Sequence, residues 1–592
     1  MQRREATQGL RSALKACRDS FAYAAFFSLF VNLLLLVPAI YMLQVYDRVL
    51  SSGSVSTLVM LTLVTAFLFL VMGGLEWVRS QILIASSNRL DALLAPRVFD
   101  SVFRQSLVSS GKVASAQPLA DLLQLRQFLT GPGLFAFFDV PWLPIYIAVM
   151  FLFHPLVGVA AIASALVLIG LAVWNELSIR GDLNEASQRS IEASNHTQRN
   201  LRNVDAIEAM GMLPRLRARW LEKQQEMLSL QTRASRRGGL VTAASKTFRV
   251  LIQTLILGLG AYLAIRHEIS AGGVIAGSIL LGRALAPLDQ MIGTWRGFVS
   301  ARESYHRLDQ LLDAAPPQAP PMALPKPQGT LSVEKLVVTP LGADAPVLRG
   351  ISLQAAPGEV LAVIGPSAAG KTTLVRAMLG LVEPTSGDVR LDDAKVDQWD
   401  RALLGQHIGY LPQDVELLDG TIAENIARFG EVDAERVVAA ADAAGVRSMI
   451  LRLPQGYATR LVGNVVSAGQ RQRIGLARAL YGMPQWIVLD EPNANLDQEG
   501  EAALAATLQA LKCAGRTVVV VTHRKDILSL VDRIALLVQG QLVLHGPRDE
   551  VLAQLLQRAS GQRDGTGARR PVAVAVPLHA AAINPDKHAA SR

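Results

Sequence analysis

Long uncharged apolar runs in the first half of the chain limit its fold more than any other feature of the sequence. The first two, residues 21–46 and 51–75, are separated only by a short polar turn. A helix needs about 20 apolar residues to cross a bilayer, and the first run also exceeds the core of a cleaved signal peptide, about 7–15 residues. We therefore predict a permanent first anchor and six spans in all, at residues 21–46, 51–75, 134–153, 156–175, 247–266 and 269–290.

The overall composition agrees with a membrane protein. Hydrophobic residues make up 51% of the 592 residues and charged residues only 18%, which excludes a mainly disordered chain. The net charge of +9 could indicate nucleic-acid binding, but in a membrane protein it more often reflects basic cytoplasmic loops. Two cysteines, Cys17 and Cys513, cannot make a disulfide framework or a metal cluster, and we interpret both as small buried apolar residues.

Lys and Arg are concentrated in two long loops between the apolar runs. Residues 76–133 contain six of them and residues 176–249 contain thirteen. The positive-inside rule therefore places the N-terminus, both long loops and everything after the sixth span in the cytoplasm. Both loops also have amphipathic helical spacing, so we expect spans two to five to continue as helices beyond the lipid.

One carboxylate in the apolar region has two interpretations. Asp139 comes just before Val140-Pro141, at the edge of the third predicted span. A carboxylate inside a bilayer is costly and often functional, whereas one at the interface can cap a helix. The capping interpretation is favoured.

A change in composition divides the chain. Residues 314–329 are rich in proline and predict a semi-extended linker after a membrane domain over residues 1–313. Residues 330–557 alternate short β-type runs with helical stretches, which is typical of an α/β domain. Residues 558–592 are rich in Gly, Ala, Arg and Pro without a period, and we interpret them as a disordered tail.

The strongest motif is a glycine-rich loop between the apolar run Val360–Ile364 and the helical stretch Thr373–Leu381. It matches the phosphate-binding pattern G-x-x-x-x-G-K-[ST] in the strand–loop–helix context that this pattern requires. Lys371 would reach the β- and γ-phosphates, and the Thr372 hydroxyl would hold Mg²⁺. The predicted nucleotide-binding residues are Gly365, Pro366, Ser367, Ala368, Ala369, Gly370, Lys371, Thr372 and Thr373.

A second apolar strand, Trp486–Asp490, ends in two carboxylates. Asp490 is placed to join the Mg²⁺ shell, and Glu491 is placed to orient and deprotonate an attacking water. Alone, this segment is equally well explained as a strand that ends in a polar turn. Together with the phosphate-binding loop, it predicts nucleotide hydrolysis.

The order and spacing of the motifs from Val360 to about Val538 resemble the ATP-binding cassette (ABC) transporters. Tyr410–Asp414 resembles their Q-loop, which implies that Gln413 contacts Mg²⁺ and the lytic water and senses the membrane domain. Thr522-His523-Arg524 resembles the segment that carries their switch histidine, here His523. The resemblance thus implies three catalytic residues, Glu491, His523 and Gln413.

Two further segments resemble elements that act across a dimer. Ser467–Arg473 resembles the signature motif, which binds the γ-phosphate held by the other subunit, and Ala494–Asp497 resembles the D-loop. The implied contacts are Ser467, Ala468, Gly469 and Gln470 in the signature and Asp497 in the D-loop.

The chain departs from the family pattern in two places. The signature usually begins Leu-Ser-Gly-Gly-Gln, whereas Val466 and Ala468 stand at its first and third positions here. No adenine-stacking aromatic is evident before the glycine-rich loop, where Thr339-Pro340-Leu341 stand, and Leu341 or Val347 would cover the base instead. We expect a looser closed dimer and weaker ATP affinity.

Other segments resemble the type I secretion exporters, namely Gln44–Leu50, Phe138–Pro144 and Ile422–Phe429. The fold implied is an α-helical six-span ABC exporter membrane domain of the type I exporter-like class, followed by an α/β P-loop ATP-binding cassette. The nearest subgroup exports proteases, lipases or haemophores, and the short segment before the first span leaves no room for an N-terminal peptidase domain. One membrane domain with one cassette is half of a transporter, so a homodimer is implied.

The implied function is ATP-driven export of unfolded proteins with C-terminal signals from the bacterial inner membrane, where the chain is multi-pass. The implied cofactors are ATP and Mg²⁺. The implied partners are an adaptor (membrane fusion) protein, an outer-membrane channel protein, the secreted protein and membrane lipids, with no nucleic acid. The alternative is an exporter of lipids or small molecules, which would need no envelope partners. The altered signature also suggests a regulatory ATP-gated protein, but intact Lys371, Asp490, Glu491 and His523 argue against it.

Overall fold

The computed structural model describes residues 10–108, 115–201, 203–314, 324–340, 342–461 and 466–560. The chain divides into two compact units, Met1–Pro317 and Gln318–Arg592. The division falls within the predicted linker, of which residues 315–323 lie outside the described part. The predicted tail from residue 561 onward also lies outside the described residues, and the helix before it ends at Ser560.

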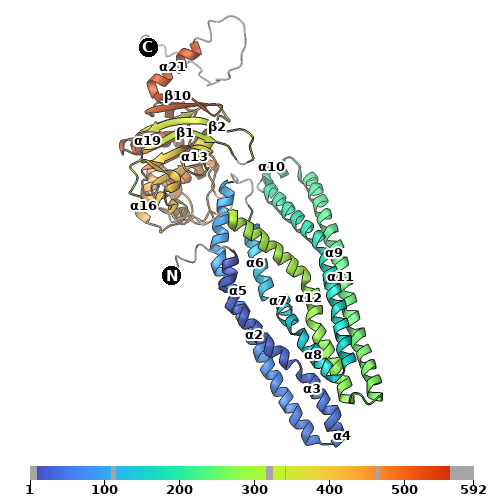
Figure 1. Cartoon of the computed structure of the whole chain (residues 1–592). Coiled ribbons are helices and arrows are strands. Elements are labelled where there is room, and N and C mark those ends of the chain that lie inside the picture. Colours follow the sequence, from blue (N-terminus) through green and yellow to red (C-terminus); the bar gives the residue numbers. More distant parts are fainter. Residues whose placement is uncertain are drawn as a thin grey trace, which may run out of the picture. The chain divides into compact units, whose positions relative to one another are not determined.

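The described part of the first unit is helical (Figure 1). Its α-helices are α1 (Leu10–Ala16), α2 (Arg18–Leu34), α3 (Val37–Gln44), α4 (Leu50–Ser52), α5 (Val55–Val108), α6 (Gln117–Thr130), α7 (Pro132–Asp139), α8 (Leu143–Phe153), α9 (Pro155–Leu201), α10 (Val204–Ala209), α11 (Leu213–Ile265) and α12 (Ala271–Ala314). A π-helical turn, Val45–Val49, joins α3 to α4, and a 3₁₀ turn, Val140–Trp142, joins α7 to α8.

Six helical stretches of the described chain are long and apolar enough to cross a membrane, which confirms the predicted six-span fold. They are Arg18–Ser52, Val55–Leu107, Pro132–Phe153, Pro155–Leu201, Leu213–Ile265 and Ala271–Ala314. The second stretch begins at Val55 rather than at residue 51. The reason is Gly53, whose left-handed backbone (φ +63°) ends the preceding helix.

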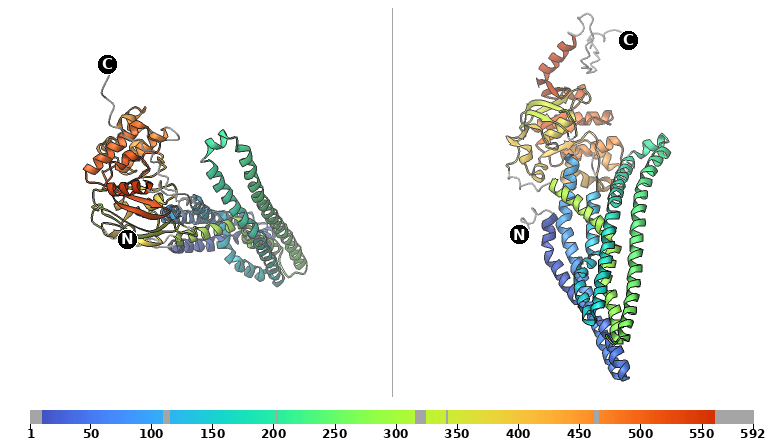
Figure 2. Two further views of the ribbon diagram at one scale, coloured as in Figure 1. Left: turned by 90° about the horizontal axis from the view of Figure 1, so that it is seen from above. Right: turned by 45° about the vertical axis from the view of Figure 1, so that its right-hand side comes forward.

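Four of these helices are much longer than a bilayer is thick. Helices α5, α9, α11 and α12 have 54, 47, 53 and 44 residues. At about 1.5 Å per residue they span roughly 65–80 Å, more than twice the hydrocarbon core of about 30 Å. Spans two, four and five therefore continue as helices, as the sequence predicts, and span six does so as well. The prediction was wrong for span three, because the stretch Pro132–Phe153 has only 22 residues and an extended Gly131 separates it from α6. Helices α9 and α11 lie side by side along most of their length (Figures 1 and 2).

Asp139 does not cap a helix, so the favoured interpretation was wrong. Its side chain makes no capping hydrogen bond, and its Oδ1 instead accepts from Arg79 Nη1 at 3.0 Å and from Asn32 Nδ2 at 2.9 Å. Arg79 lies in α5, beyond the predicted second span, which ends at residue 75. Arg79 is 6% exposed, and in such surroundings a guanidinium holds a carboxylate more strongly than a helix end does.

This ion pair leads to a stability prediction. Arg79→Met leaves the Asp139 carboxylate half-buried without its cation, which should lower the free energy of unfolding by about 3–5 kcal/mol. Thermal unfolding in detergent measures the loss. The double variant Arg79→Met/Asp139→Asn leaves no unpaired charge and should recover most of it. An Arg79→Met protein as stable as the parent would contradict a structural role for the pair.

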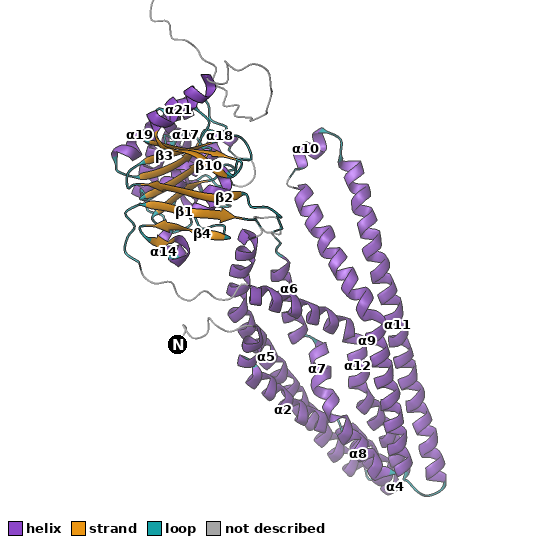
Figure 3. Cartoon of the chain, turned by 45° about the horizontal axis from the view of Figure 1, so that its top comes forward, coloured by secondary structure: helices purple, strands orange, loops and turns teal. Residues whose placement is uncertain are grey.

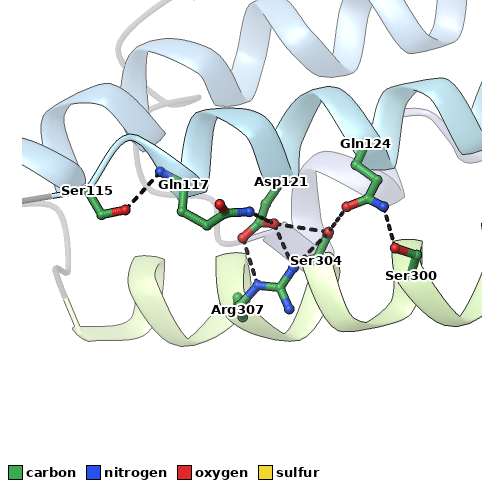
Figure 4. A network of polar contacts seen from close by, with 7 residues as sticks. All are labelled: Ser115, Gln117, Asp121, Gln124, Ser300, Ser304 and Arg307. Atoms are coloured by element: carbon green, nitrogen blue, oxygen red, sulfur yellow. Dashed lines mark hydrogen bonds and ion pairs between the residues drawn. The ribbon is translucent and has the colours of Figure 1, made fainter. Parts of the chain in front are cut away.

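A fully buried carboxylate joins α6 to α12, at positions that lie outside the predicted spans 134–153 and 269–290 (Figure 4). Asp121 is 1% exposed and accepts two hydrogen bonds from Arg307, from Nε at 2.8 Å and from Nη2 at 2.6 Å. Gln117 Nε2 and Ser304 Oγ also donate to its Oδ1, at 3.0 and 3.2 Å. The bidentate contact raises the pKa of Arg307. This network fixes the end of α12, the last helix of the first unit, against α6.

The described part of the second unit forms two sheets (Figure 3). Its strands are β1 (Leu331–Val338), β2 (Leu348–Ala355), β3 (Val360–Ile364), β4 (Ser386–Leu391), β5 (Ala394–Lys395), β6 (Ile408–Leu411), β7 (Trp486–Asp490), β8 (Thr517–Val521), β9 (Arg533–Val538) and β10 (Gln541–Pro547). Strands β2-β1-β4-β5 form an antiparallel sheet. The other sheet has the order β10-β9-β3-β8-β7-β6, and it is parallel except for β10.

The α-helices in the described part of the second unit are α13 (Lys371–Met378), α14 (Arg401–Leu404), α15 (Ile422–Ile426), α16 (Ala434–Ala443), α17 (Arg447–Leu451), α18 (Ala468–Leu480), α19 (Gln498–Cys513), α20 (Lys525–Leu528) and α21 (Arg548–Ser560). Helices α13, α18, α19 and α21 contact strands of the parallel sheet, and α15 and α16 pack against α18. Cys513, the last residue of α19, is exposed, which corrects the prediction that both cysteines are buried. It lies at a helix end next to exposed Lys512 and Ala514, whereas Cys17 packs inside the first unit.

Strands β3, β8 and β7 are neighbours, and every one of their residues is buried. Because the carboxyl ends of parallel strands meet at one edge, the segments that follow these strands must lie close together. This edge therefore carries the predicted site.

Candidate nucleotide-binding site

The phosphate-binding loop follows β3 and ends at the first residue of α13. Gly365 has φ +156°, and a Cβ atom there would lie 2.1 Å from the Leu537 carbonyl oxygen, so only glycine fits. Gly370 has φ +99° and stands directly before α13. The loop curls around a cavity of about 300 Å³ lined by Val347, Ser367, Ala368, Ala369, Gly370, Lys371, Thr372, Thr373, Gln413 and Glu491. Most of the predicted nucleotide-binding residues thus surround one cavity at a helix N-terminus.

Lys371 reaches back across this loop. Its Nζ donates to the carbonyl oxygens of Gly365 at 2.9 Å and Pro366 at 3.0 Å, and the residue is only 7% exposed. Burial lowers the pKa of Lys371, against the opposing charges of Glu491 and Asp490. The ammonium group is therefore held inside the loop, where it can meet a phosphate.

Asp490 is the deepest charged group of the site. The residue is 1% exposed, and neither carboxylate oxygen has a hydrogen-bond partner among the described residues. Burial raises the pKa of Asp490, against the weaker effects of the nearby Thr372 hydroxyl and the Lys371 ammonium. A buried carboxylate without a partner, next to a hydroxyl, fits the ligand chemistry of a divalent cation.

The three predicted catalytic side chains meet beside the cavity. Glu491 Oε2 accepts from Gln413 Nε2 at 3.0 Å, and Glu491 Oε1 lies 3.2 Å from His523 Nε2. They come from the segments after β6, β7 and β8, which are brought together because these strands are adjacent and parallel. Glu491 has φ +50°, a left-handed conformation that is strained for a residue with a side chain. The fold therefore holds the Glu491 backbone in a strained conformation that directs its carboxylate toward Gln413 and His523.

The signature residues begin α18 and, in the described chain, do not line the cavity. Ser467 Oγ accepts from the Gln470 backbone N at 3.2 Å, and Gln470 Oε1 accepts from the Ser467 N at 2.9 Å. A Cβ atom on Gly469 would lie 2.6 Å from the Asn495 carbonyl oxygen, so this position requires glycine. Ala468 is exposed at the first helical position, and residues 462–465 lie outside the described part.

The remaining predicted residues have local roles in the structure. Asp497 caps α19, its Oδ1 accepting from the Gly500 N at 2.9 Å. Val347 lines the cavity, whereas Leu341 lies outside the described residues. The close approach of Gly469 to the Asn495 carbonyl oxygen was not predicted. A glycine can indicate that another backbone segment passes close by, and here that segment is the D-loop.

Comparisons with known proteins agree with this site. Residues 21–286 match the family model "ABC transporter transmembrane region", and residues 348–494 match the model "ABC transporter". The type I secretion system ATP-binding protein PrsD of Rhizobium meliloti is 43% identical, over 93% of this chain and 95% of its own. The toxin RTX-I translocation ATP-binding protein of Actinobacillus pleuropneumoniae is 28% identical, over 90% of this chain and 77% of its own.

A solved structure shares the fold. It is described as a bacterial Atm1-family ABC exporter with ATP bound, and it superposes with a TM-score of 0.79 at 21% identity, over 93% of this chain and 99% of its own. At this identity the likeness concerns the fold alone. It confirms the predicted exporter architecture.

Proposed function

The chain belongs to the type I secretion ATP-binding proteins of the ABC transporter family, and we propose that it drives unfolded proteins with C-terminal signals across the cell envelope. It is an ATPase coupled to transport, and its homologues serve type I protein secretion. The observation that carries the proposal is the alignment with a type I secretion relative, which covers 93% of this chain and 95% of the relative. An exporter of lipids or small molecules remains the rival, since the fold alone is common to both.

The working unit that we propose is a homodimer in which each nucleotide lies between two cassettes. The loop around Lys371 would hold the phosphates through backbone N–H groups and the ammonium. The signature Ser467 of the second copy would close the site over the γ-phosphate, with Asp497 of the D-loop beside it. This arrangement agrees with a signature that is separate from the cavity of its own chain.

The hydrolytic step that we propose uses Glu491 as general base. Its carboxylate would accept a proton from the attacking water while Gln413 and His523 hold its two oxygens in place. Thr372, Asp490 and Gln413 would hold Mg²⁺, which supplies charge neutralisation of the phosphates when bound. Hydrolysis then releases the two cassettes and resets the membrane helices.

The chain is a multi-pass inner-membrane protein. We further propose that the N-terminus and the cassette are cytoplasmic, because the basic loops favour that side. Type I secretion relatives and the exporter fold imply a dimer with envelope partners. The partners proposed are a membrane fusion (adaptor) protein, an outer-membrane channel and the secreted protein.

The test compares the culture media of cells that carry the intact chain and cells that carry Lys371→Ala. A polypeptide that disappears from the medium of the variant would establish protein secretion and identify the cargo. Lys395→Ala is the matched control, because Lys395 only pairs with Asp388 at the surface. Identical media from cells that express both proteins would move the assignment to lipid or small-molecule export.

A further inference from the structure

Arg428 occupies an unusual backbone position just after α15. Arg428 and the next residue, Phe429, both have φ +58°, the left-handed region that residues with side chains avoid. Two such residues in a row cost conformational energy, so other contacts must hold them in place. The segment Ile422–Phe429 carries no role in the nucleotide site described above.

The side chain of Arg428 supplies those contacts. Its guanidinium donates to three backbone carbonyl oxygens: Arg478 at 3.0 Å, Ala479 at 2.9 Å and Gly405 at 2.6 Å. Arg478 and Ala479 belong to the last turn of α18, whose carbonyl groups lack partners within the helix. A cation at this end also stabilises the helix dipole. Arg428 is therefore the side-chain cap of α18.

The opposite end of α18 begins with the signature. Ser467 is its N-cap, and the helix has 13 residues, so the two ends are roughly 18–20 Å apart. A helix of this length is stiff, and a tilt at its C-terminus moves Ser467 at its N-terminus. Fixing the last turn thus fixes the signature.

The same segment also holds the chain that leads from the Q-loop. Asn425, fully buried, accepts from the Leu418 N through Oδ1 at 2.9 Å and donates to the Leu418 O at 2.9 Å. Arg478 of α18 donates to the Glu416 O at 3.1 Å. The stretch between Gln413 and Arg428 is therefore bound to the C-terminal end of α18 through Glu416 and Arg428, and Asn425 holds Leu418 in place within the stretch.

A second arginine continues these contacts to the phosphate-binding helix. Arg401, in α14, donates through Nη1 to the Leu379 O at 2.6 Å, at the end of α13. Gly405, the third acceptor of Arg428, follows α14 directly. Within one cassette, Arg401 and Arg428 therefore connect the C-terminal ends of α13, which begins at the phosphate-binding loop, and α18, which begins at the signature.

We propose that Arg428 is a positioning residue for ATP hydrolysis, which sets the signature helix α18 relative to the phosphate-binding helix α13 of the same cassette. This inference rests on the proposed role of Ser467 in closing the partner's site. Removing the guanidinium should leave nucleotide binding at the chain's own loop intact and impair closure over a γ-phosphate.

The test uses the full-length chain with Arg428→Gln, Arg428→Lys and the control Arg436→Gln. Arg436 is exposed and only pairs with Asp433 at the start of α16. MgADP affinity reports the phosphate-binding loop alone, whereas kcat and the vanadate-trapped fraction report the closed site. We expect Arg428→Gln to keep the parent MgADP affinity while kcat and trapping fall about 10- to 100-fold, as misplacement of a reacting group typically costs.

The kcat and the trapped fraction of Arg428→Lys should lie between those of the parent and those of Arg428→Gln. An ammonium lacks the planar fork of a guanidinium and cannot reach all three carbonyl oxygens. It also serves as the test variant if Arg428→Gln does not fold. Unchanged kcat in either folded variant would overturn the inference. So would a loss of kcat no larger than the loss of MgADP-binding protein, since that pattern indicates a purely structural role.

Ser467→Ala separates this inference from the proposed function. If Ser467→Ala lowers trapping but Arg428→Gln does not, the positioning role is wrong and the proposed dimer mechanism stands. If Ser467→Ala leaves both kcat and trapping at the parent level, the proposed role of the signature is wrong, and the inference that rests on it is wrong as well.

Discussion

Replacing Glu491 by glutamine should lower the ATPase rate by about 10²–10⁴-fold, the usual contribution of a general base. The amide keeps the size of the carboxylate and can still contact Gln413 and His523, which now lie 3.0 and 3.2 Å from the two oxygens. It cannot accept the proton of the attacking water. Because binding is preserved and hydrolysis is not, the variant should also accumulate an ATP-bound closed dimer. Steady-state turnover and retained ATP after gel filtration measure the two effects.

The matched control is Glu499→Gln, an exposed glutamate in the first turn of α19 that removes the same charge nearby. Its turnover should equal that of the parent. Glu491→Gln with parental turnover would refute the base assignment. It would equally remove the reason for the strained backbone at Glu491.

The nucleotide site could be predicted from sequence because its motifs are contiguous and sit at strand ends. A glycine-rich loop after an apolar run, and a carboxylate after another, need only the parallel order of β3, β8 and β7 to meet. Membrane spans are equally local, since length and hydropathy suffice. Their ends are harder to place, as the left-handed Gly53 shows by delaying the second span to Val55.

Contacts between distant segments could not be predicted in this way. Asp139 has no sequence neighbour that points to Arg79, which is 60 residues away, so a cap was the simpler interpretation. The same holds for Arg428, whose acceptors at Arg478 and Ala479 are 50 and 51 residues away. In both cases a charged side chain satisfies backbone or side-chain groups of another helix, and no local pattern records the partner.

Replacing Lys371 by alanine should abolish nucleotide-dependent activity because it weakens ATP binding, the step that precedes the hydrolysis blocked by Glu491→Gln. One charge-assisted hydrogen bond contributes about 1.5–3 kcal/mol, so ATP affinity should fall by about one to two powers of ten. The loop itself also loses its internal donor, because Lys371 Nζ contacts the Gly365 and Pro366 carbonyl oxygens. Direct binding of a fluorescent ATP analogue to the purified chain measures the change.

The arginine variant shows whether position or charge matters at residue 371. Lys371→Arg keeps the charge, but its planar guanidinium is bulkier in a site where the lysine is only 7% exposed and already lies within 3.0 Å of two carbonyl oxygens. We therefore expect Lys371→Arg to bind ATP nearly as poorly as Lys371→Ala, while Lys395→Ala binds like the parent. Full affinity in Lys371→Ala would mean that the backbone N–H groups and the α13 dipole alone hold the phosphates, and the ammonium would then have to act after binding.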